Sequence, residues 1–326
     1  MASQSQPVTT TDVPNYVGEL LFLGQKFGRS PLLSLAGLGT ASSGGLTAGG
    51  YDIVTGSYFA MGNVIEGDAP AQDGQTEDAS IAAMTDTSYT GAQATNYTQI
   101  FRKTWVVSYA SEAQTGTISG VAINGAPQAI VSAAVVQREA HLKQMAADYE
   151  YSALYGTGAA WTNATTTGAM GGLFTAVEAG SETAAAGVPL STTLIDTEIA
   201  RMAAAGAEFI DPVISVAAFQ RQQLNRLYGN AIQSQTFGGT NVTSLLLPVI
   251  GNCRVIDNPI MAADDFGIVD LNHFRLVFAL KPGMPPIFIE PLAKIAAGDR
   301  EQLFSIASIN YGNIAYHGMI SGLATS

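Results

Sequence analysis

Charge, cysteine and long apolar runs are all scarce in this chain of 326 residues. Charged residues make up only 12% of the sequence, whereas they make up about 25% of an average soluble domain. The single cysteine, Cys253, excludes an intramolecular disulfide framework. No apolar run approaches the ~20 residues that a membrane-spanning helix needs. Because obligate interfaces are large and poor in charge, the composition predicts a soluble protein whose surface is mostly buried against other subunits.

Basic residues are especially few, with 14 Lys and Arg against 26 Asp and Glu, which gives a net charge of -12. They form no basic cluster of the kind that proteins use to neutralise the phosphates of nucleic acid. A role in reading DNA sequence is therefore not expected. Residues 1–16 carry no positive charge ahead of an apolar stretch. No Sec-type signal is predicted, and the chain is expected to stay in the cytoplasm that makes it.

Catalytic and metal-binding motifs are absent as well. The sequence contains no P-loop, no G-x-S-x-G, no H-E-x-x-H and no C-x-x-C. Cys253 is expected to be a buried, inert thiol, and the adjacent Asp264 and Asp265 give little support for paired-carboxylate catalysis. The three histidines have the spacing of neither a zinc site nor a triad. We expect His141 at a surface or interface, His273 in a solvated position, and His317 in a strand. No enzyme activity, cofactor or metal is predicted.

The first third of the chain reads as two extended segments. Residues 1–50 begin with polar residues and end in the Gly-rich run 44–50, and they predict an arm that packs on something else or stays mobile. Residues 51–110 hold two groups of β-formers around a small, acidic stretch, which predicts a long two-stranded excursion. Between Ser30 and Phe101 there are seven acids and no Lys or Arg. This excursion is either a solvated loop or an arm that docks on a basic patch of a neighbouring subunit.

The clearest predicted element is a helix over 127–155. Its apolar residues fall near helical spacing, Pro127 suits a first turn, and Gly156 suits a stop. At 1.5 Å per residue this helix would be about 40 Å long, which suggests a spine. Residues 156–190 then form a Gly/Ala/Thr-rich crossing that we interpret as a hinge into a second lobe.

The rest of the chain alternates helices and strands, which predicts an α/β lobe. A helix is predicted over 193–205, where Thr193 and Asp196 have capping spacing, and another over 217–228. A short buried strand at 212–216 lies between them. Three more strands are predicted in this lobe, followed by three that could return to the first lobe: 253–257, 267–270, 275–279, then 287–290, 302–308 and 313–317.

Three stretches and the order of elements resemble one known family. The stretch Asn96–Ser108, which leads to the spine, is similar to the return strand of an E-loop. The stretches Gly251–Asp257 and Phe266–Val269 are similar to late A-domain strands. Together they resemble the Hong Kong 97 fold of major capsid proteins from tailed, double-stranded-DNA bacteriophages, an α+β fold. The resemblance implies these parts: an N-terminal arm 1–50, an E-loop 51–110, a P-domain 111–189 with the spine helix 127–155, an A-domain 190–282, and a return to the P-domain over 283–326.

The resemblance also implies a function. Such proteins assemble into hexamers and pentamers of an icosahedral shell that encloses double-stranded DNA without binding its sequence. Expected partners are further copies of the chain, a portal protein, and separate scaffolding or decoration proteins, with no membrane involved. The expected location is the virion capsid, assembled in the host bacterial cytoplasm. We expect acids of the E-loop to face basic residues of an adjacent subunit: the acids are Glu66, Asp68, Asp73, Glu77 and Asp78, and the candidate partners are Arg138, Lys143, Arg221, Arg226 and Arg300.

The sequence departs from the family's type member in two ways. It has no long, charged, helical N-terminal segment that could act as a fused scaffold, and no identifiable Lys–Asn pair for covalent cross-linking, so non-covalent contacts are expected. The Gly-rich segments 44–50 and 156–172 are expected to bend between copies. Three alternatives remain: an encapsulin shell, a tail-tube, sheath or surface-layer subunit, and a monomeric enzyme.

Overall fold

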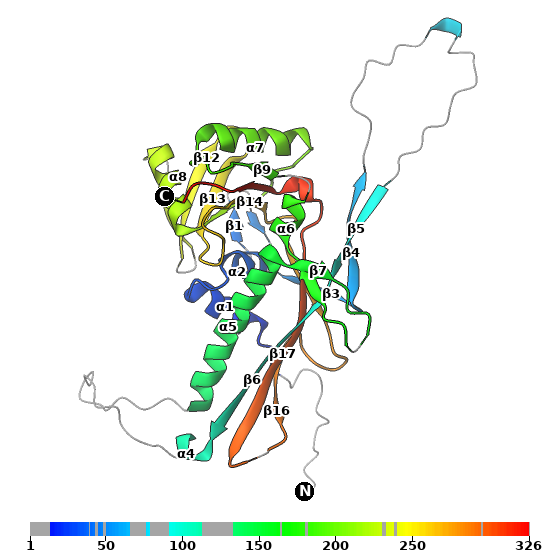
Figure 1. Cartoon of the computed structure of the whole chain (residues 1–326), viewed down its shortest axis with the longest axis vertical. Coiled ribbons are helices and arrows are strands. Elements are labelled where there is room, and N and C mark those ends of the chain that lie inside the picture. Colours follow the sequence, from blue (N-terminus) through cyan, green and yellow to red (C-terminus); the bar gives the residue numbers. More distant parts are fainter. Residues whose placement is uncertain are drawn as a thin grey trace, which may run out of the picture.

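The computed structural model of the chain describes most residues from Pro14 to Thr325. The described ranges are 14–38, 40–42, 45–47, 50–65, 76–78, 91–112, 133–163, 165–179, 182–229, 233–237, 240–294 and 296–325. The molecule has three parts (Figure 1): a lower region of long strands beside the helix α5, a lobe above it, and a β-hairpin that projects away from both. No helix among the described residues combines the length and apolar character needed to cross a bilayer.

The N-terminal region differs from the predicted extended arm, because residues 17–38 fold into two helices. These are α1 (Val17–Lys26) and α2 (Pro31–Leu38), which pack on each other and on α5. Gly37 allows the close approach, since a Cβ there would lie 2.5 Å from a methyl carbon of Leu21. The buried side chains are mostly leucines: Leu20, Leu21, Leu23, Leu32, Leu33 and Leu35. After α2 the short strands β1 (Thr40–Ser42) and β2 (Gly45–Thr47) pair with each other.

The predicted spine helix is confirmed over α5 (Ala133–Tyr155), and the predicted positions 127–132 lie outside the described residues. Its buried face includes Leu142, Met145 and Tyr149, as the periodicity predicted. Val135 is instead 47% exposed at the lower end. The buried face of α5 packs against a five-stranded sheet.

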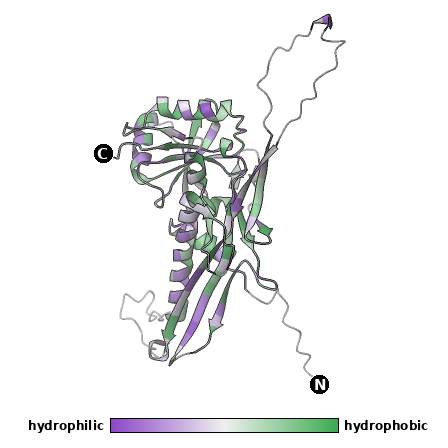
Figure 2. Ribbon diagram, turned by 45° about the vertical axis from the view of Figure 1, so that its right-hand side comes forward, coloured by the Kyte–Doolittle hydropathy of each residue, from purple (hydrophilic) through white to green (hydrophobic). Residues whose placement is uncertain are grey.

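That five-stranded sheet brings together both ends of the sequence. Its strands are β3 (Tyr51–Val54), β6 (Gln99–Ser108), β15 (Arg275–Ala279), β16 (Ile287–Leu292) and β17 (Gly298–Asn310). The long strand β17 pairs antiparallel with β6, β16 and β15, and β15 pairs in parallel with β3. The predicted return of 287–290 and 302–308 to the first lobe is therefore confirmed. Figure 2 shows hydrophobic and hydrophilic residues mixed along these strands, as in a sheet with one covered face.

The lobe is a seven-stranded mixed sheet in the order β11-β12-β13-β10-β14-β18-β9. Its strands are β9 (Glu182–Ala184), β10 (Pro212–Val216), β11 (Gln233–Phe237), β12 (Thr240–Leu247), β13 (Gly251–Asp257), β14 (Phe266–Asp270) and β18 (Gly318–Ser321). Its long helices are α7 (Thr192–Ala204) and α8 (Ala218–Tyr228). The predicted helices and the buried strand β10 are confirmed. Ser191, rather than Thr193, caps α7, because its Oγ accepts a hydrogen bond of 3.3 Å from the amide of Leu194.

One predicted strand is wrong. Residues 314–316 form a short 3₁₀ helix, Ile314–Tyr316, and the strand that follows is β18, which joins the lobe sheet and not the lower sheet. Asn313 starts this helix, because its side-chain oxygen accepts a hydrogen bond of 3.0 Å from the amide of Ala315. The local cap therefore overrides the apolar residues that suggested a strand.

Short elements connect the three parts. After β6 comes α4 (Tyr109–Glu112), and after α5 come β7 (Thr157–Ala159), β8 (Ala169–Gly171) and α6 (Leu173–Glu178). The projecting hairpin consists of β4 (Tyr58–Ile65) and β5 (Gly91–Tyr97), paired antiparallel with an irregularity between Met61 and Asn63. We call this hairpin the arm.

Candidate subunit interface

The arm packs on the core of the subunit only through Phe59 and Met61 of β4, of the side chains that the structure describes there. β4 and β5 pair with each other in a sheet of two strands (Figure 1), and Tyr58 is 65% exposed. Residues 93–95 of β5 are also exposed. A two-stranded hairpin is only marginally stable by itself in water. The arm therefore needs cover from outside the subunit.

The root of the arm, by contrast, is held firmly. The side-chain nitrogen Nδ2 of Asn96 donates hydrogen bonds to the carbonyls of Gly171, at 3.1 Å, and Ile309, at 2.8 Å. Its oxygen accepts from the amide of Gly171 at 2.7 Å. Next to it, the hydroxyl of Thr98 accepts from the indole N–H of Trp161 at 3.1 Å. Because Asn96 is buried and fully hydrogen-bonded, it fixes the direction in which the arm leaves the body.

Strand β6 carries different chemistry on its two faces. Phe101, Trp105 and Val107 are buried against the α5 side, whereas Ile100 and Val106 are 50% and 59% exposed. Among the described residues β6 pairs with β17 alone, so its other edge has no strand partner. A strand edge of this kind can accept an extended segment from another chain.

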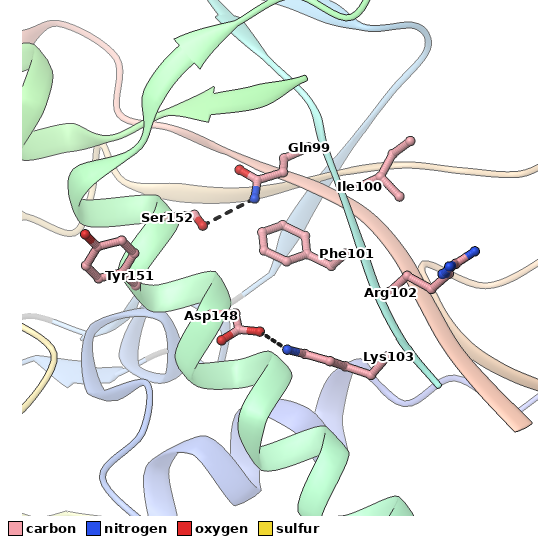
Figure 3. A pocket seen from close by; sticks show the side chains of 8 residues that line it. All are labelled: Gln99, Ile100, Phe101, Arg102, Lys103, Asp148, Tyr151 and Ser152. Atoms are coloured by element: carbon pink, nitrogen blue, oxygen red, sulfur yellow. Dashed lines mark hydrogen bonds and ion pairs between the residues drawn. The ribbon is translucent and has the colours of Figure 1, made fainter. Parts of the chain in front are cut away.

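A groove of about 390 Å³ lies along this edge, between β6 and α5 (Figure 3). Two side-chain pairs bridge the strand and the helix. Gln99 donates to the hydroxyl of Ser152 at 3.4 Å, and Lys103 forms an ion pair with Asp148. Tyr151, at the groove rim, is 58% exposed. We call this feature the spine groove.

Arg102 lies at the spine groove and points away from the ion pair of its neighbour Lys103 (Figure 3). It is exposed, and it forms no ion pair with any residue that the structure describes. On the adjacent strand Arg300 faces the same side of the sheet, because it pairs in register with the outward-facing Val106. No ion pair to Arg300 occurs within the described ranges either. The outer face of the lower sheet thus presents two arginines beside exposed apolar residues.

The acidic and basic residues predicted to meet between subunits differ in whether the structure describes them and in whether they already have a partner within the subunit. Glu77 and Asp78 are exposed, while Glu66, Asp68 and Asp73 lie outside the described residues. Three predicted basic partners make contacts inside their own subunit: Arg138 pairs with Glu301 at 3.2 Å, Lys143 pairs with Glu139 at 2.7 Å, and Arg221 donates to the carbonyl of Val255 at 2.9 Å. Arg226 and Arg300 are the two without an ion pair in the described part of the chain. Sequence reasoning missed Arg102, although its place in an alternating strand was a usable signal.

The histidines and the cysteine occupy structural positions. Burial raises the pKa of Cys253 to about 12, as expected for an inert thiol. Burial lowers the pKa of His317 to about 4, and its imidazole bridges Tyr311 and Asp270 ahead of β18, not within a strand. His141 stacks on Trp105, with ring centroids 5.0 Å apart. Within the described ranges, no group of three or more His, Cys, Asp or Glu could hold a metal ion.

Residues 4–324 match the family of SU10 major capsid proteins. The chain belongs to the SU10 major capsid protein family. It is a shell-forming capsid protein of a virion, and copies of it assemble with one another. Family membership supports this interpretation over the encapsulin, tail and surface-layer alternatives, and it implies a structural role.

Solved capsid structures share the fold. The capsid of cyanophage A-1(L) is 13% identical, with a TM-score of 0.57 over 85% of this chain and 90% of the other. A structure from Mycobacterium phage Adephagia is 12% identical, with a TM-score of 0.52 over 85% and 88%. The capsid of a native GTA particle is 9% identical, with a TM-score of 0.51 over 84% and 88%. These likenesses confirm the predicted α+β capsid fold. A search of curated proteins found no match.

Proposed function

We propose that this chain builds an icosahedral shell of hexamers and pentamers that encloses double-stranded DNA, and that the arm of one subunit covers the spine groove of the next. Family membership supports the shell. The single observation that carries the contact is the arm itself, which projects from the body and pairs with no strand outside its own hairpin in the described residues. The spine groove offers an unpaired strand edge for it.

Charge favours this contact. Six acids and no Lys or Arg lie between β4 and β5 in the sequence, so the segment that joins the two strands of the arm brings negative charge. The outer sheet face brings Arg102 and Arg300, which have no ion pair in their own subunit's described residues. Opposite charges across an interface steer association and fix register more than they add affinity. We therefore propose Arg102 and Arg300 as the partners of the acids between β4 and β5. Arg138, Lys143 and Arg221 are no longer candidates, because they make contacts within their own subunit. Arg226 serves as the control position.

Domain boundaries follow the sheets. We propose to keep the arm within an E-loop of 51–110 and the spine within a P-domain that the chain enters again near its end. The predicted A-domain of 190–282 is better drawn as 182–270 with 318–323, since β15 lies in the lower sheet and β18 in the lobe sheet. We further propose assembly in the host bacterial cytoplasm, with a portal protein and separate scaffolding or decoration proteins as partners.

The test uses charge reversal in a system where the wild-type chain forms shells, alone or with co-expressed phage genes. Arg102→Glu combined with Arg300→Glu should abolish shells in electron microscopy while circular dichroism and thermal unfolding stay near wild type. The matched control is Arg226→Glu on α8, which should still assemble. Equal loss in the control, or normal shells in the double variant, would refute the docking surface.

The complementary change tests the arm acids. Neutralising Glu66, Asp68 and Asp73 together should lower shell yield and shell stability. Reversing the same three acids to Arg should restore part of the assembly that Arg102→Glu with Arg300→Glu removes, because contacting charges couple in a double-mutant cycle. Unchanged assembly in the neutralised variant, or no rescue, would show that the acids act elsewhere.

A further inference from the structure

A pocket of about 170 Å³ lies at the lower end of the subunit, where β6, β16, β17 and the start of α5 meet (Figure 1). Part of its wall is apolar, formed by Trp105 of β6, Pro291 and Leu292 of β16, and Ala134 of α5. The rest of the wall carries charged side chains from β17 and from the turn before it. We call this pocket the foot pocket. We propose that the foot pocket binds a carboxylate group.

The indole N–H of Trp105 is the first sign of a ligand. Its side chain is 6% exposed and stacks on His141 of α5, with ring centroids 5.0 Å apart. The indole nitrogen is buried and has no hydrogen-bond acceptor among the described residues. Buried donors in proteins are nearly always hydrogen-bonded. Trp161 follows that rule, because its N–H donates to Oγ1 of Thr98 at 3.1 Å, so Trp105 is the exception that needs an acceptor.

The acids at the foot pocket already have cations of their own. Lys294 forms an ion pair of 2.6 Å with Asp299 and donates to the hydroxyl of Tyr109 at 3.0 Å. Both carboxylate oxygens of Glu301 accept from Nη2 of Arg138, at 3.2 and 3.3 Å. Neither acid that lines the pocket is therefore left to receive the N–H of the indole.

The groups left over are donors. The Nε atom of Arg138 is buried and has no acceptor in the described part of the chain. Arg138 precedes His141 by about one turn of α5, and Glu301 lies opposite Trp105 in the register of β17 and β6, so these groups surround one place. Arg300 also lines the pocket and forms no ion pair within the described ranges. Three cations thus stand against two acids, and one carboxylate would balance the surplus.

The size of the foot pocket fits a carboxylate on a short apolar stem. One water molecule needs about 15 Å³, whereas an apolar cavity of about 150 Å³ holds benzene. The foot pocket, at about 170 Å³, has room for acetate, for butanoate, or for the side chain of one Asp or Glu. A carboxylate offers two acceptor oxygens, and its hydrogen bonds are stronger than those of a neutral acceptor. Its stem would lie on the apolar wall.

Two sources supply such a carboxylate. One is a small carboxylate that is free in solution. The other is an acid of a neighbouring subunit, and this source rests on the proposed function, in which an arm lies along β6. The spine groove is lined by residues 99–103 of β6, and the foot pocket is lined by 105 and 107 of the same strand. An arm that points down β6 brings the six acids between β4 and β5 towards the foot pocket.

NMR of the two indole N–H groups tests the foot pocket on the purified full-length chain, labelled with ¹⁵N-tryptophan. Trp161→Phe assigns the resonances, and the measurement itself uses the wild type. Acetate and butanoate should shift the Trp105 resonance saturably at constant ionic strength. The Trp161 resonance is the control and should stay in place, because its N–H already has an acceptor. Butanamide, which is neutral and similar in shape, should bind at least about tenfold more weakly.

A matched pair of variants tests the surplus cation. Arg300→Gln should weaken the binding of butanoate severalfold, because the pocket then has no cation in excess. Arg226→Gln on α8 removes the same charge away from the pocket and should leave the binding unchanged. Equal affinity in both variants would show that the carboxylate is not held by this pocket.

A peptide of residues 66–78 with blocked ends distinguishes the two sources. For an acid of a neighbouring subunit, the peptide should shift the Trp105 resonance at lower concentration than butanoate does, and the same peptide with amides in place of its acids should not. A response to acetate and butanoate alone identifies a free carboxylate. No shift with any carboxylate, or an equal shift with butanamide, would overturn the proposal. These measurements need no assembly, so failure of the docking surface and failure of the foot pocket are distinguishable.

Discussion

The place where α5 meets residues 258–265, which we call the spine–lobe joint, and the arm differ in where their polar and apolar groups find partners. At the joint, Glu150, Asn258 and Tyr155 are bonded to groups of the same chain. On the arm, the root at Asn96 is bonded to the body, but Tyr58 is exposed and the two strands pair in a sheet only with each other. The subunit therefore folds around the joint, whereas the arm and the outer sheet face gain their partners on assembly. Substitutions at the joint should change folding, and substitutions at the outer surfaces should change assembly at nearly constant stability.

The largest expected effect lies in the core beside the joint. Phe174 is 0% exposed and packs on Tyr155, with ring centroids 6.0 Å apart. Phe174→Ala should lower the free energy of unfolding by about 3–5 kcal/mol, the usual cost of a large cavity. Urea denaturation measures this change. Phe22→Ala, at a side chain 55% exposed, is the control and should stay within about 0.5 kcal/mol; equal losses would contradict the placement of the core.

The dependence of stability on pH distinguishes Glu150 at the joint from His317 in the lobe. Burial lowers the pKa of His317 to about 4 from an ordinary 6.5, so the folded state favours the neutral ring. Stability from this group is present above pH 6.5 and is lost towards pH 4, by about 3 kcal/mol at most. Burial raises the pKa of Glu150 to about 7 from an ordinary 4.5, so Glu150 acts in the opposite direction as pH falls from 7 to 4.5. The thermal unfolding temperature of Glu150→Gln should therefore fall more steeply with acid than that of the wild type. Parallel curves would show that Glu150 does not offset the effect of His317.

The root of the arm should show an intermediate effect. Asn96→Ala leaves the amide of Gly171 and the carbonyl of Ile309 without these partners. We expect a loss of about 1–3 kcal/mol in unfolding free energy, together with faster hydrogen exchange over 91–98. Gln93→Ala, at an exposed position of β5, is the control and should change neither. If both variants behave alike, the root does not fix the arm.

The smallest expected change in stability lies at the spine groove. Tyr151→Ala removes a side chain that is 58% exposed in the subunit, so unfolding should change by no more than about 0.5 kcal/mol. Shell yield, counted by electron microscopy, should fall severalfold because the arm of a neighbour loses its contact. Gln222→Ala, exposed on α8, should assemble normally. Normal yield with Tyr151→Ala would show that the groove is not covered.

Local patterns predicted some elements well and left others hidden. β15 and β10 were predicted at their observed bounds, because short apolar runs between turns indicate buried strands. The helices α1 and α2 were missed because each is short and much of their stability comes from tertiary contacts such as the cap that Glu150 supplies. Basic partners could not be chosen from sequence, since Arg138 finds Glu301 at a separation of 163 residues. The alternating pattern of β6 marks Arg102 as outward-facing, but the unpaired strand edge beside it is a feature of the fold.

The most direct measurement is a cryo-electron microscopy structure of the assembled shell. We expect closed particles in which β4 and β5 of one subunit lie along β6 and α5 of its neighbour, with Arg102 within ion-pairing distance of an acid between β4 and β5. Open tubes or sheets would contradict the closed shell. A closed shell in which the spine groove faces solvent would contradict the central claim that the arm completes its neighbour's exposed edge.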